Sequence, residues 1–267
     1  MKKADCRYIH EETVHNLVSP KEIVPIIVEM FHPKSVIDFG CGIGTFIHEF
    51  SNAGVPKLTG VDGEWVNKEL LSKYMKKEQF ITHNLETPFI SNYRYDVAIC
   101  LEVAEHIDEK YADIFVNSLV GMSDIIIFSA AIPLQGGQGH INEQWPEYWQ
   151  EKFAKHGYDM LDIIRPILWN NPKVFHWYKQ NMFVVAKQKY ADEIKQKYVS
   201  FSHDIAVSLV HPDLYLREAK RLKEALSGEW QWKAASSGQM SIRLYLRMLK
   251  KAIIRKTKKI IGASSKV

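Results

Sequence analysis

Short apolar runs alternate with amphipathic segments along the first 187 residues. The run at residues 95–100 is continuous, as is typical of a strand at the centre of a parallel sheet. Strands are predicted at residues 35–39, 57–61, 79–83, 95–100, 124–128, 160–164 and 181–186. Helices are predicted from an N-cap at Ser19, from about Thr45, and at 65–76, 110–120 and 145–156. This alternation predicts a doubly wound α/β fold whose seven-stranded sheet closes with an antiparallel last strand.

Beyond residue 187 the strand pattern stops and only helical segments are predicted. A helix is expected at 212–226, with Pro212 at its start and Gly228 just past its end. Ser236-Ser237-Gly238 has the composition of a flexible joint. The expected organisation is therefore a main domain at 1–187, a helical C-terminal extension at 188–235 and a tail at 236–267.

A glycine-rich turn follows the first predicted strand. Gly40, Gly42 and Gly44 allow positive φ angles and a close approach of backbone to a ligand, and the next helix would point free N–H groups at that ligand. Asp62 lies about twenty residues past the glycines, after the second strand, where an acid binds a ribose diol. An adenosine-containing ligand is one interpretation, and a tight strand-to-helix turn of any α/β protein is the other.

No lysine follows the glycines as a P-loop requires, and the third glycine of the dinucleotide fingerprint is missing from its usual spacing. The stretch Val36-Ile37-Asp38-Phe39-Gly40-Cys41-Gly42-Ile43-Gly44 resembles the first motif of class I S-adenosylmethionine (SAM)-dependent methyltransferases. The resemblance covers roughly residues 13–187 and implies a Rossmann-like sheet and SAM as cofactor. The cofactor-binding residues that it implies are Asp38, Gly40, Cys41, Gly42, Asp62, Gly63, Asn84, Leu85 and Leu101. Asn84 departs from the acid usual in the family, although its side-chain carbonyl can still accept a hydrogen bond.

Glu102, Glu105 and His106 follow the fourth predicted strand. In a helical turn, positions i, i+3 and i+4 share one face, so these side chains are expected to converge, and His140 in the later glycine-rich loop is a fourth candidate. The set suits Mg²⁺ or Mn²⁺ and resembles the metal site of small-RNA terminal 2′-O-methyltransferases. Glu102, His106 and His140 are also the catalytic candidates. The alternative is a metal-free site in which His106 or His140 is the general base.

Three segments indicate a subgroup within the resembled family: residues 135–146, 177–183 and 211–215. They are similar to a bacterial subgroup associated with capsule and lipopolysaccharide gene clusters. That likeness implies a glycan or phospho-sugar acceptor, methylated on a hydroxyl or on a phosphoryl or phosphoramidate oxygen. The aromatic insert at 168–180 is either a wall of the active site or a hydrophobic plug.

Charge is distributed unevenly along the chain. The net charge is +4, but residues 241–267 hold nine Lys or Arg and no Asp or Glu, which leaves −5 for residues 1–240. In a helix at 242–261, one face would hold Ile242, Leu246, Leu249, Ile253 and Ile260, and the other Arg247, Lys251, Arg255, Lys258 and Lys259. Such a helix is predicted to contact an anionic inner membrane; packing on the main domain, disorder and a nucleic-acid patch are the alternatives.

Few cysteines, no apolar N-terminal segment and no long apolar run predict a reduced cytoplasmic protein. The basic helix at 242–261 would make this protein peripheral at the inner membrane. The function expected first is metal-assisted O-methylation of a glycan precursor. An RNA 2′-O-methyltransferase is a second hypothesis, disfavoured by the acidic charge of residues 1–240. A non-catalytic SAM-binding tether in a glycan-assembly complex is the third.

Overall fold

The structure, a computed structural model, describes residues 8–10, 12–198, 209–227, 229–239 and 241–264, without the side chains of 226–232 and 255–264. The chain divides into two compact units, Met1–Leu214 and Tyr215–Val267. These units do not test the predicted domain boundaries after residues 187 and 235, which stay a prediction.

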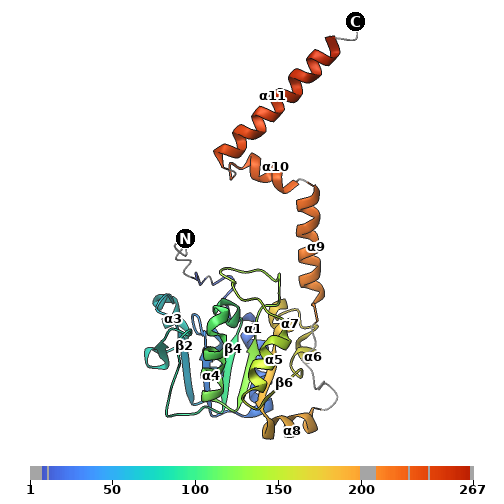
Figure 1. Cartoon of the computed structure of the whole chain (residues 1–267). Helices are drawn as coiled ribbons and strands as arrows, with labels where there is room; N and C mark the ends of the chain where they lie inside the picture. Colours follow the sequence, from blue (N-terminus) through green and yellow to red (C-terminus); the bar gives the residue numbers. More distant parts are fainter. Residues whose placement is uncertain (1–7, 11, 199–208, 228, 240, 265–267) are drawn as a thin grey trace. The chain divides into compact units, whose positions relative to one another are not determined.

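The first unit is built on one seven-stranded sheet with the order β3-β2-β1-β4-β5-β7-β6 (Figure 1). Its strands are β1 (Ser35–Phe39), β2 (Lys57–Asp62), β3 (Phe80–Thr82), β4 (Val97–Leu101), β5 (Ile125–Ser129), β6 (Tyr158–Leu161) and β7 (Phe183–Lys187). Strands β1 to β5 pair in parallel, and β7 is antiparallel to both of its neighbours. The predicted seven-stranded α/β sheet with an antiparallel last strand is confirmed.

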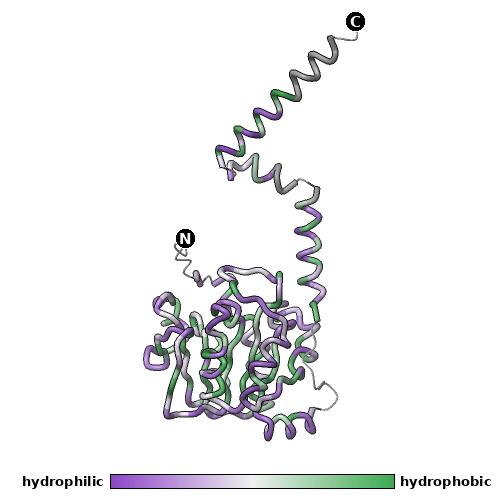
Figure 2. The backbone as a smooth tube through the Cα atoms, in the orientation of Figure 1, coloured by the Kyte–Doolittle hydropathy of each residue, from purple (hydrophilic) through white to green (hydrophobic). Residues whose placement is uncertain are grey.

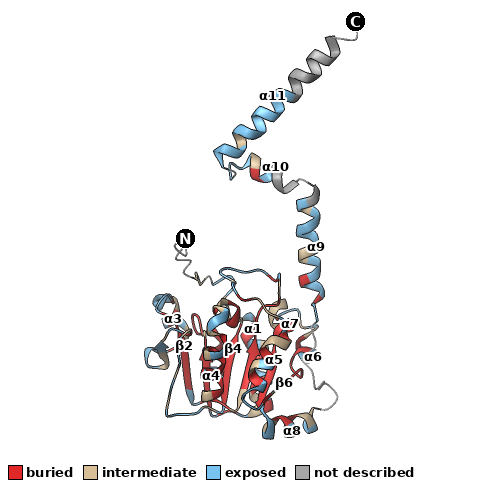
Figure 3. Ribbon diagram, in the orientation of Figure 1, coloured by how far each residue is buried: buried red, intermediate tan, exposed pale blue. Residues whose placement is uncertain are grey.

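Helices cover both faces of the sheet. They are α1 (Val18–Phe31), α2 (Thr45–Asn52), α3 (Lys68–Tyr74), α4 (Ala112–Met122), α5 (Pro146–Ala154), α6 (Arg165–Leu168), α7 (His176–Asn181) and α8 (Gln188–Lys197), with 3-10 turns η1 (Lys77–Gln79), η2 (Ala104–His106) and η3 (Glu109–Tyr111). Side chains that alternate along each strand enter two core clusters, one packed on α1, α2 and α8 and the other on α4 and α5. The central strands β1, β4 and β5 are therefore almost entirely buried, whereas the edge strand β3 is partly exposed (Figures 2 and 3).

Two helix starts differ from the sequence-based expectation. Ser19 is not an N-cap: α1 begins at Val18, and the buried Ser19 Oγ accepts a hydrogen bond from Phe175 N at 3.0 Å. The helix expected from residue 65 starts at Lys68, because the Asn67 side chain caps it by accepting from Glu69 N and Leu70 N. The first error has a tertiary cause, since Phe175 is far from Ser19 in sequence.

The second unit is helical where it is described. Helix α9 (Pro212–Ser227) leads into this unit, which also contains α10 (Glu229–Ser236) and α11 (Ile242–Ser264). The Tyr245 hydroxyl donates to the carbonyls of Ala234 and Ala235, at 3.1 and 2.8 Å, and so attaches α11 to α10. The helix expected at 242–261 is therefore present, although its predicted side-chain positions from Arg255 onward lie outside the described residues. None of the described helices is long and apolar enough to cross a membrane.

Candidate active site

The glycine turn lies where β1 and β2 end side by side. Gly40, Gly42 and Gly44 have φ angles of 76°, 54° and 88°, values that L residues rarely adopt. Asp62 holds the turn, since Oδ2 accepts from Gly42 N at 2.8 Å and Oδ1 accepts from Gly63 N at 2.6 Å. Parallel strands end at the same edge of a sheet, which is why the residues of two separate motifs meet here.

Two buried carboxyl groups lie beside this turn. Burial raises the pKa of Asp62 to about 6, although its two backbone hydrogen bonds act in the opposite direction. Burial, and then the neighbouring Asp62, raise the pKa of Asp38 well above its usual range. Both groups therefore bind a proton more readily in the folded protein than in the unfolded chain.

Replacing Asp62 with asparagine tests this charge balance. Because the folded pKa is raised, protonation of Asp62 contributes stability at low pH that is lost as the pH rises through about 6. We expect the unfolding free energy of the wild type minus that of Asp62→Asn to fall by about 2 kcal/mol between about pH 4 and pH 6. Denaturant titrations of both proteins measure this difference, in which titrating groups that do not interact with Asp62 cancel. A difference independent of pH would contradict the prediction.

The remaining predicted cofactor residues lie at the ends of the same strands. Cys41, Leu85 and Leu101 are buried, whereas Asn84 is exposed. The Asn84 side-chain oxygen accepts from Glu86 N at 3.0 Å and so caps a local turn. Their roles in cofactor binding stay predictions.

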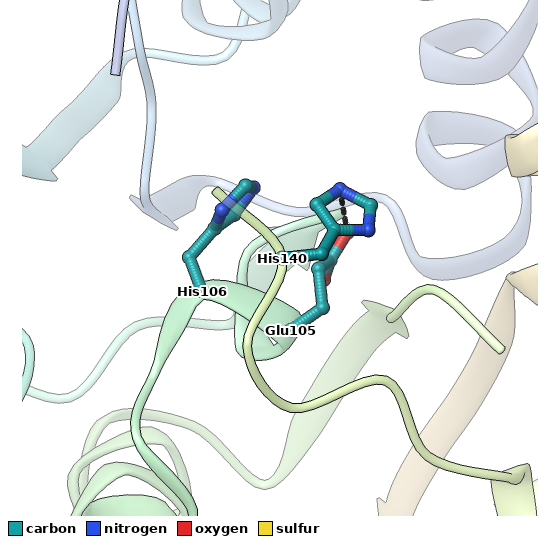
Figure 4. Close-up of side chains that lie close together, drawn as sticks. All are labelled: Glu105, His106 and His140. Carbon is teal, nitrogen blue, oxygen red and sulfur yellow. Dashed lines mark ion pairs between the residues drawn. The ribbon is translucent and has the colours of Figure 1, made fainter. Parts of the chain in front are cut away.

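Glu105, His106 and His140 form a compact group at the carboxyl end of β4 (Figure 4). One ligand atom from each residue lies within 4.8 Å of the other two. Glu105 is fully buried, and neither of its carboxylate oxygens has a hydrogen-bond partner within the described part of the chain. His140 Nε2 lies 3.9 Å from Glu105 Oε1. Ionising a buried carboxyl group without a strong donor is costly, and either protonation or a bound cation would relieve that cost.

Both imidazoles are oriented through their Nδ1 atoms. His106 Nδ1 lies 3.3 Å from the Gly139 carbonyl oxygen, and His140 Nδ1 lies 2.8 Å from Glu143 Oε1. Since only an N–H can donate to these oxygens, Nε2 keeps the lone pair in each neutral ring. Burial, followed by the neighbouring His140, lowers the pKa of His106 to about 4, so this ring is neutral at physiological pH. The neutral His106 ring thus offers its Nε2 lone pair to a ligand.

Glu143 organises the loop that carries His140. In addition to the histidine, its carboxylate accepts from Leu134 N and Gly136 N, both at 2.7 Å. Gly137 leaves room for the ring, because a Cβ there would lie 2.1 Å from His140 Nε2. Glu143 was not among the residues predicted from the sequence; its signal was an acid three residues after a candidate metal-binding histidine.

Glu102 does not join this group. The turn η2 begins only at Ala104, and Glu102 itself has a left-handed φ of 56°, so the single helical turn expected to carry Glu102, Glu105 and His106 is absent. The Glu102 carboxylate accepts instead from Gln135 Nε2 at 2.9 Å and from Asn181 Nδ2 at 3.1 Å. Its predicted catalytic and metal-binding roles stay predictions.

An N-terminal segment that the sequence analysis did not identify lies between the glycine turn and the metal candidate. The Tyr8 ring meets the His106 ring edge-on, with centroids 5.1 Å apart, and its hydroxyl is 3.1 Å from His15 Nε2. His10 lies against Gly42, where its ring is 3.1 Å from the position of an added Cβ. The sequence feature that could have identified this segment is its three ring-bearing residues, Tyr8, His10 and His15.

Comparisons with known proteins agree with this fold. Residues 16–116 match the family described as "Methyltransferase domain". SAM-bound CalS10, an amino pentose methyltransferase from Micromonospora echinaspora involved in calicheamicin biosynthesis, is 11% identical over 67% of this chain and 98% of that chain, with a TM-score of 0.51. The methyltransferase domain of bacterial CtHen1 is 20% identical over 64% of this chain and 100% of that chain, with a TM-score of 0.46. No curated protein matches the chain.

The sheet order, the antiparallel β7 and the glycine turn after β1 occur together with a matched domain at residues 16–116. The chain therefore has the Rossmann-like methyltransferase fold, and residues 16–116 within it are similar to a methyltransferase domain.

Proposed function

We propose that the protein is a metal-assisted, SAM-dependent O-methyltransferase that acts on a glycan precursor. The observation that carries this proposal is the buried Glu105 carboxylate, which has no hydrogen-bond partner in the described structure and faces His140 Nε2, with His106 close by. Gly40 of the glycine turn lies against Val103, two residues before Glu105, so a donor bound at the turn and an acceptor bound at the group would lie near each other.

The turn is suited to SAM. Positive φ angles at Gly40, Gly42 and Gly44 open the backbone toward a ligand, and the buried Asp62 carboxylate lies at the end of β2, where it would bind the ribose hydroxyls. SAM supplies a methyl group that is already activated on sulfur. The chain's own task is then to align an acceptor oxygen and to accept its proton.

The group at β4 is suited to Mn²⁺ or Mg²⁺. Glu105 would supply a carboxylate oxygen, and His106 and His140 would supply their Nε2 atoms. When bound, such an ion would make an acceptor hydroxyl easier to deprotonate. The hydrogen bonds from the Nδ1 atoms to Gly139 and Glu143 keep both rings in the tautomer that this role requires.

The acceptor class rests on residue charge and on the resemblance described above. Residues 1–240 carry a net charge of −5, which disfavours the phosphate backbone of RNA. Segments 135–146 and 177–183 are the ones that resemble the glycan-cluster subgroup, and they contribute Gln135, His140 and Asn181 to the site. We infer that these segments select a sugar hydroxyl or a phosphoryl or phosphoramidate oxygen.

Methyl transfer from radiolabelled SAM to nucleotide-sugar and phospho-sugar acceptors tests the proposal. We expect transfer to a sugar acceptor that falls when EDTA removes metal and returns with Mn²⁺ or Mg²⁺. Full activity in EDTA would contradict the metal. Transfer to RNA 3′ ends but to no sugar acceptor would contradict the glycan substrate, and S-adenosylhomocysteine binding without any transfer would favour the tether.

Replacing Glu143 with glutamine tests whether this residue orients His140 for metal binding. The neutral amide weakens the acceptor for His140 Nδ1–H, so we expect Mn²⁺ affinity to fall by about 10- to 100-fold. Electron paramagnetic resonance of free Mn²⁺ measures this loss. The exposed Glu151→Gln in α5 is the matched control and should bind Mn²⁺ as the wild type does. Equal affinities for all three proteins would show that Glu143 does not orient His140.

A further inference from the structure

Helix α11 presents large apolar side chains to solvent. Ile242, Leu246 and Leu249 recur at helical spacing and are 77%, 60% and 58% exposed. Figure 3 shows this exposure along the described part of the helix. Three adjacent exposed aliphatic side chains on one stripe form an apolar surface that marks an interaction site.

The rest of the helix surface holds basic side chains together with the exposed Leu244, Met248 and Ile254. Arg243, Arg247, Lys250 and Lys251 lie away from the apolar stripe. Across residues 241–267 there are nine Lys or Arg and no Asp or Glu. The partner must therefore offer an apolar layer and negative charge together.

A second copy of the helix does not meet this requirement. Self-association through the apolar stripe would place two segments side by side that each hold nine Lys or Arg and no acidic residue to pair with them. The helix is also not apolar enough to cross a bilayer. Its 23 residues extend over about 34 Å and can lie flat in a membrane interface.

We propose that α11 binds the surface of an anionic lipid bilayer. Ile242, Leu246 and Leu249 enter the boundary between head groups and acyl chains, while Arg247 and Lys251 contact the anionic head groups. The hydrogen bonds of Tyr245 to α10 give the bound helix a fixed neighbour within its own unit. The inference does not depend on the methyltransferase activity.

Cosedimentation of the full chain with vesicles tests the proposal. We expect binding to phosphatidylglycerol-containing vesicles at low salt, weaker binding as salt rises, and little binding to pure phosphatidylcholine. The double variant Leu246→Glu/Leu249→Glu should bind about a hundredfold more weakly, because it loses two leucine side chains that would be buried in the bilayer interface. Arg247→Glu/Lys251→Glu should bind at least about tenfold more weakly, since two favourable charges are reversed.

Matched controls lie on α9. Leu222 is 60% exposed, as Leu246 is, so Leu222→Glu makes the same chemical change away from α11 and should leave binding unchanged. Lys220→Glu/Lys223→Glu makes the same charge change at exposed positions of α9. S-adenosylhomocysteine affinity, measured for every variant, reports whether the first unit is intact.

Three results would overturn the proposal. One is equal binding of the wild type and the Leu246→Glu/Leu249→Glu variant to anionic vesicles. Another is a dimer in solution that this variant abolishes, which would assign the apolar stripe to a second copy. The third is salt-sensitive RNA binding without vesicle binding, which would make the tail a nucleic-acid site.

Discussion

Replacing Glu105 with glutamine is expected to lower the rate of methyl transfer by about a thousandfold and to remove Mn²⁺ binding. The carboxylate is the only anionic ligand in the group that it forms with His106 and His140, and its oxygens have no hydrogen-bond partner in the described structure. A metal ion that activates a hydroxyl lowers the activation barrier by several kcal/mol, which corresponds to a rate change of this size. Steady-state rates and calorimetric Mn²⁺ titrations measure the two effects.

The same substitution has an expected effect on stability that distinguishes a ligand from a structural residue. Burial, and then the nearby Glu102, raise the pKa of Glu105, so ionising it in the metal-free protein is unfavourable. Glu105→Gln should therefore be at least as stable as the wild type without metal, and it should no longer gain stability when Mn²⁺ is added. The exposed Glu109→Gln is the matched control. A variant that is unstable, or that still binds Mn²⁺, would contradict the metal site.

Replacing Gly40 with alanine is expected to destabilise the protein by about 3 kcal/mol or more. A Cβ at this position would lie 2.3 Å from Val103 Cγ2, and the backbone has a φ of +76° that disfavours any side chain. The loss combines a steric overlap in the core with backbone strain. Chemical denaturation measures it, and loss of S-adenosylhomocysteine binding should accompany it.

Gly54 provides the control for Gly40. It has a similar φ of +84°, but nothing lies within 4 Å of an added Cβ. Gly54→Ala should therefore show strain alone, about 1 to 2 kcal/mol. Adding Val103→Ala to Gly40→Ala should recover part of the difference. Equal losses at Gly40 and Gly54 would show that contact with Val103 does not constrain the turn.

Local patterns in the sequence predicted the sheet and the glycine turn well. The continuous apolar run 35–39 became β1, and Asp62 lies beside the turn because adjacent parallel strands end at one edge. The antiparallel pairing of β7 with β6 was also expected. Pairing of β7 with β5 joins strands that are far apart in sequence, and no local periodicity encodes it.

The candidate site was predicted only in part, and the reason is visible at Glu102. Spacing by three and four residues places side chains together only if the intervening backbone is helical, whereas the chain after β4 passes through a left-handed residue before η2 begins. Gln135 and Asn181, from two distant segments, then hold the Glu102 carboxylate. Helical spacing alone could not predict these contacts.

The sequence by itself determined the elements that depend on local periodicity and backbone freedom: buried strands, the glycine turn, the His and Glu candidates and the two-faced α11. Tertiary structure alone decided which side chains meet. It brought His140 to Glu105, placed Glu143 behind His140 and set Tyr8 against His106. The physical reason is that local conformation depends on neighbouring residues, whereas a buried polar side chain takes whichever partners the folded chain brings within hydrogen-bonding distance.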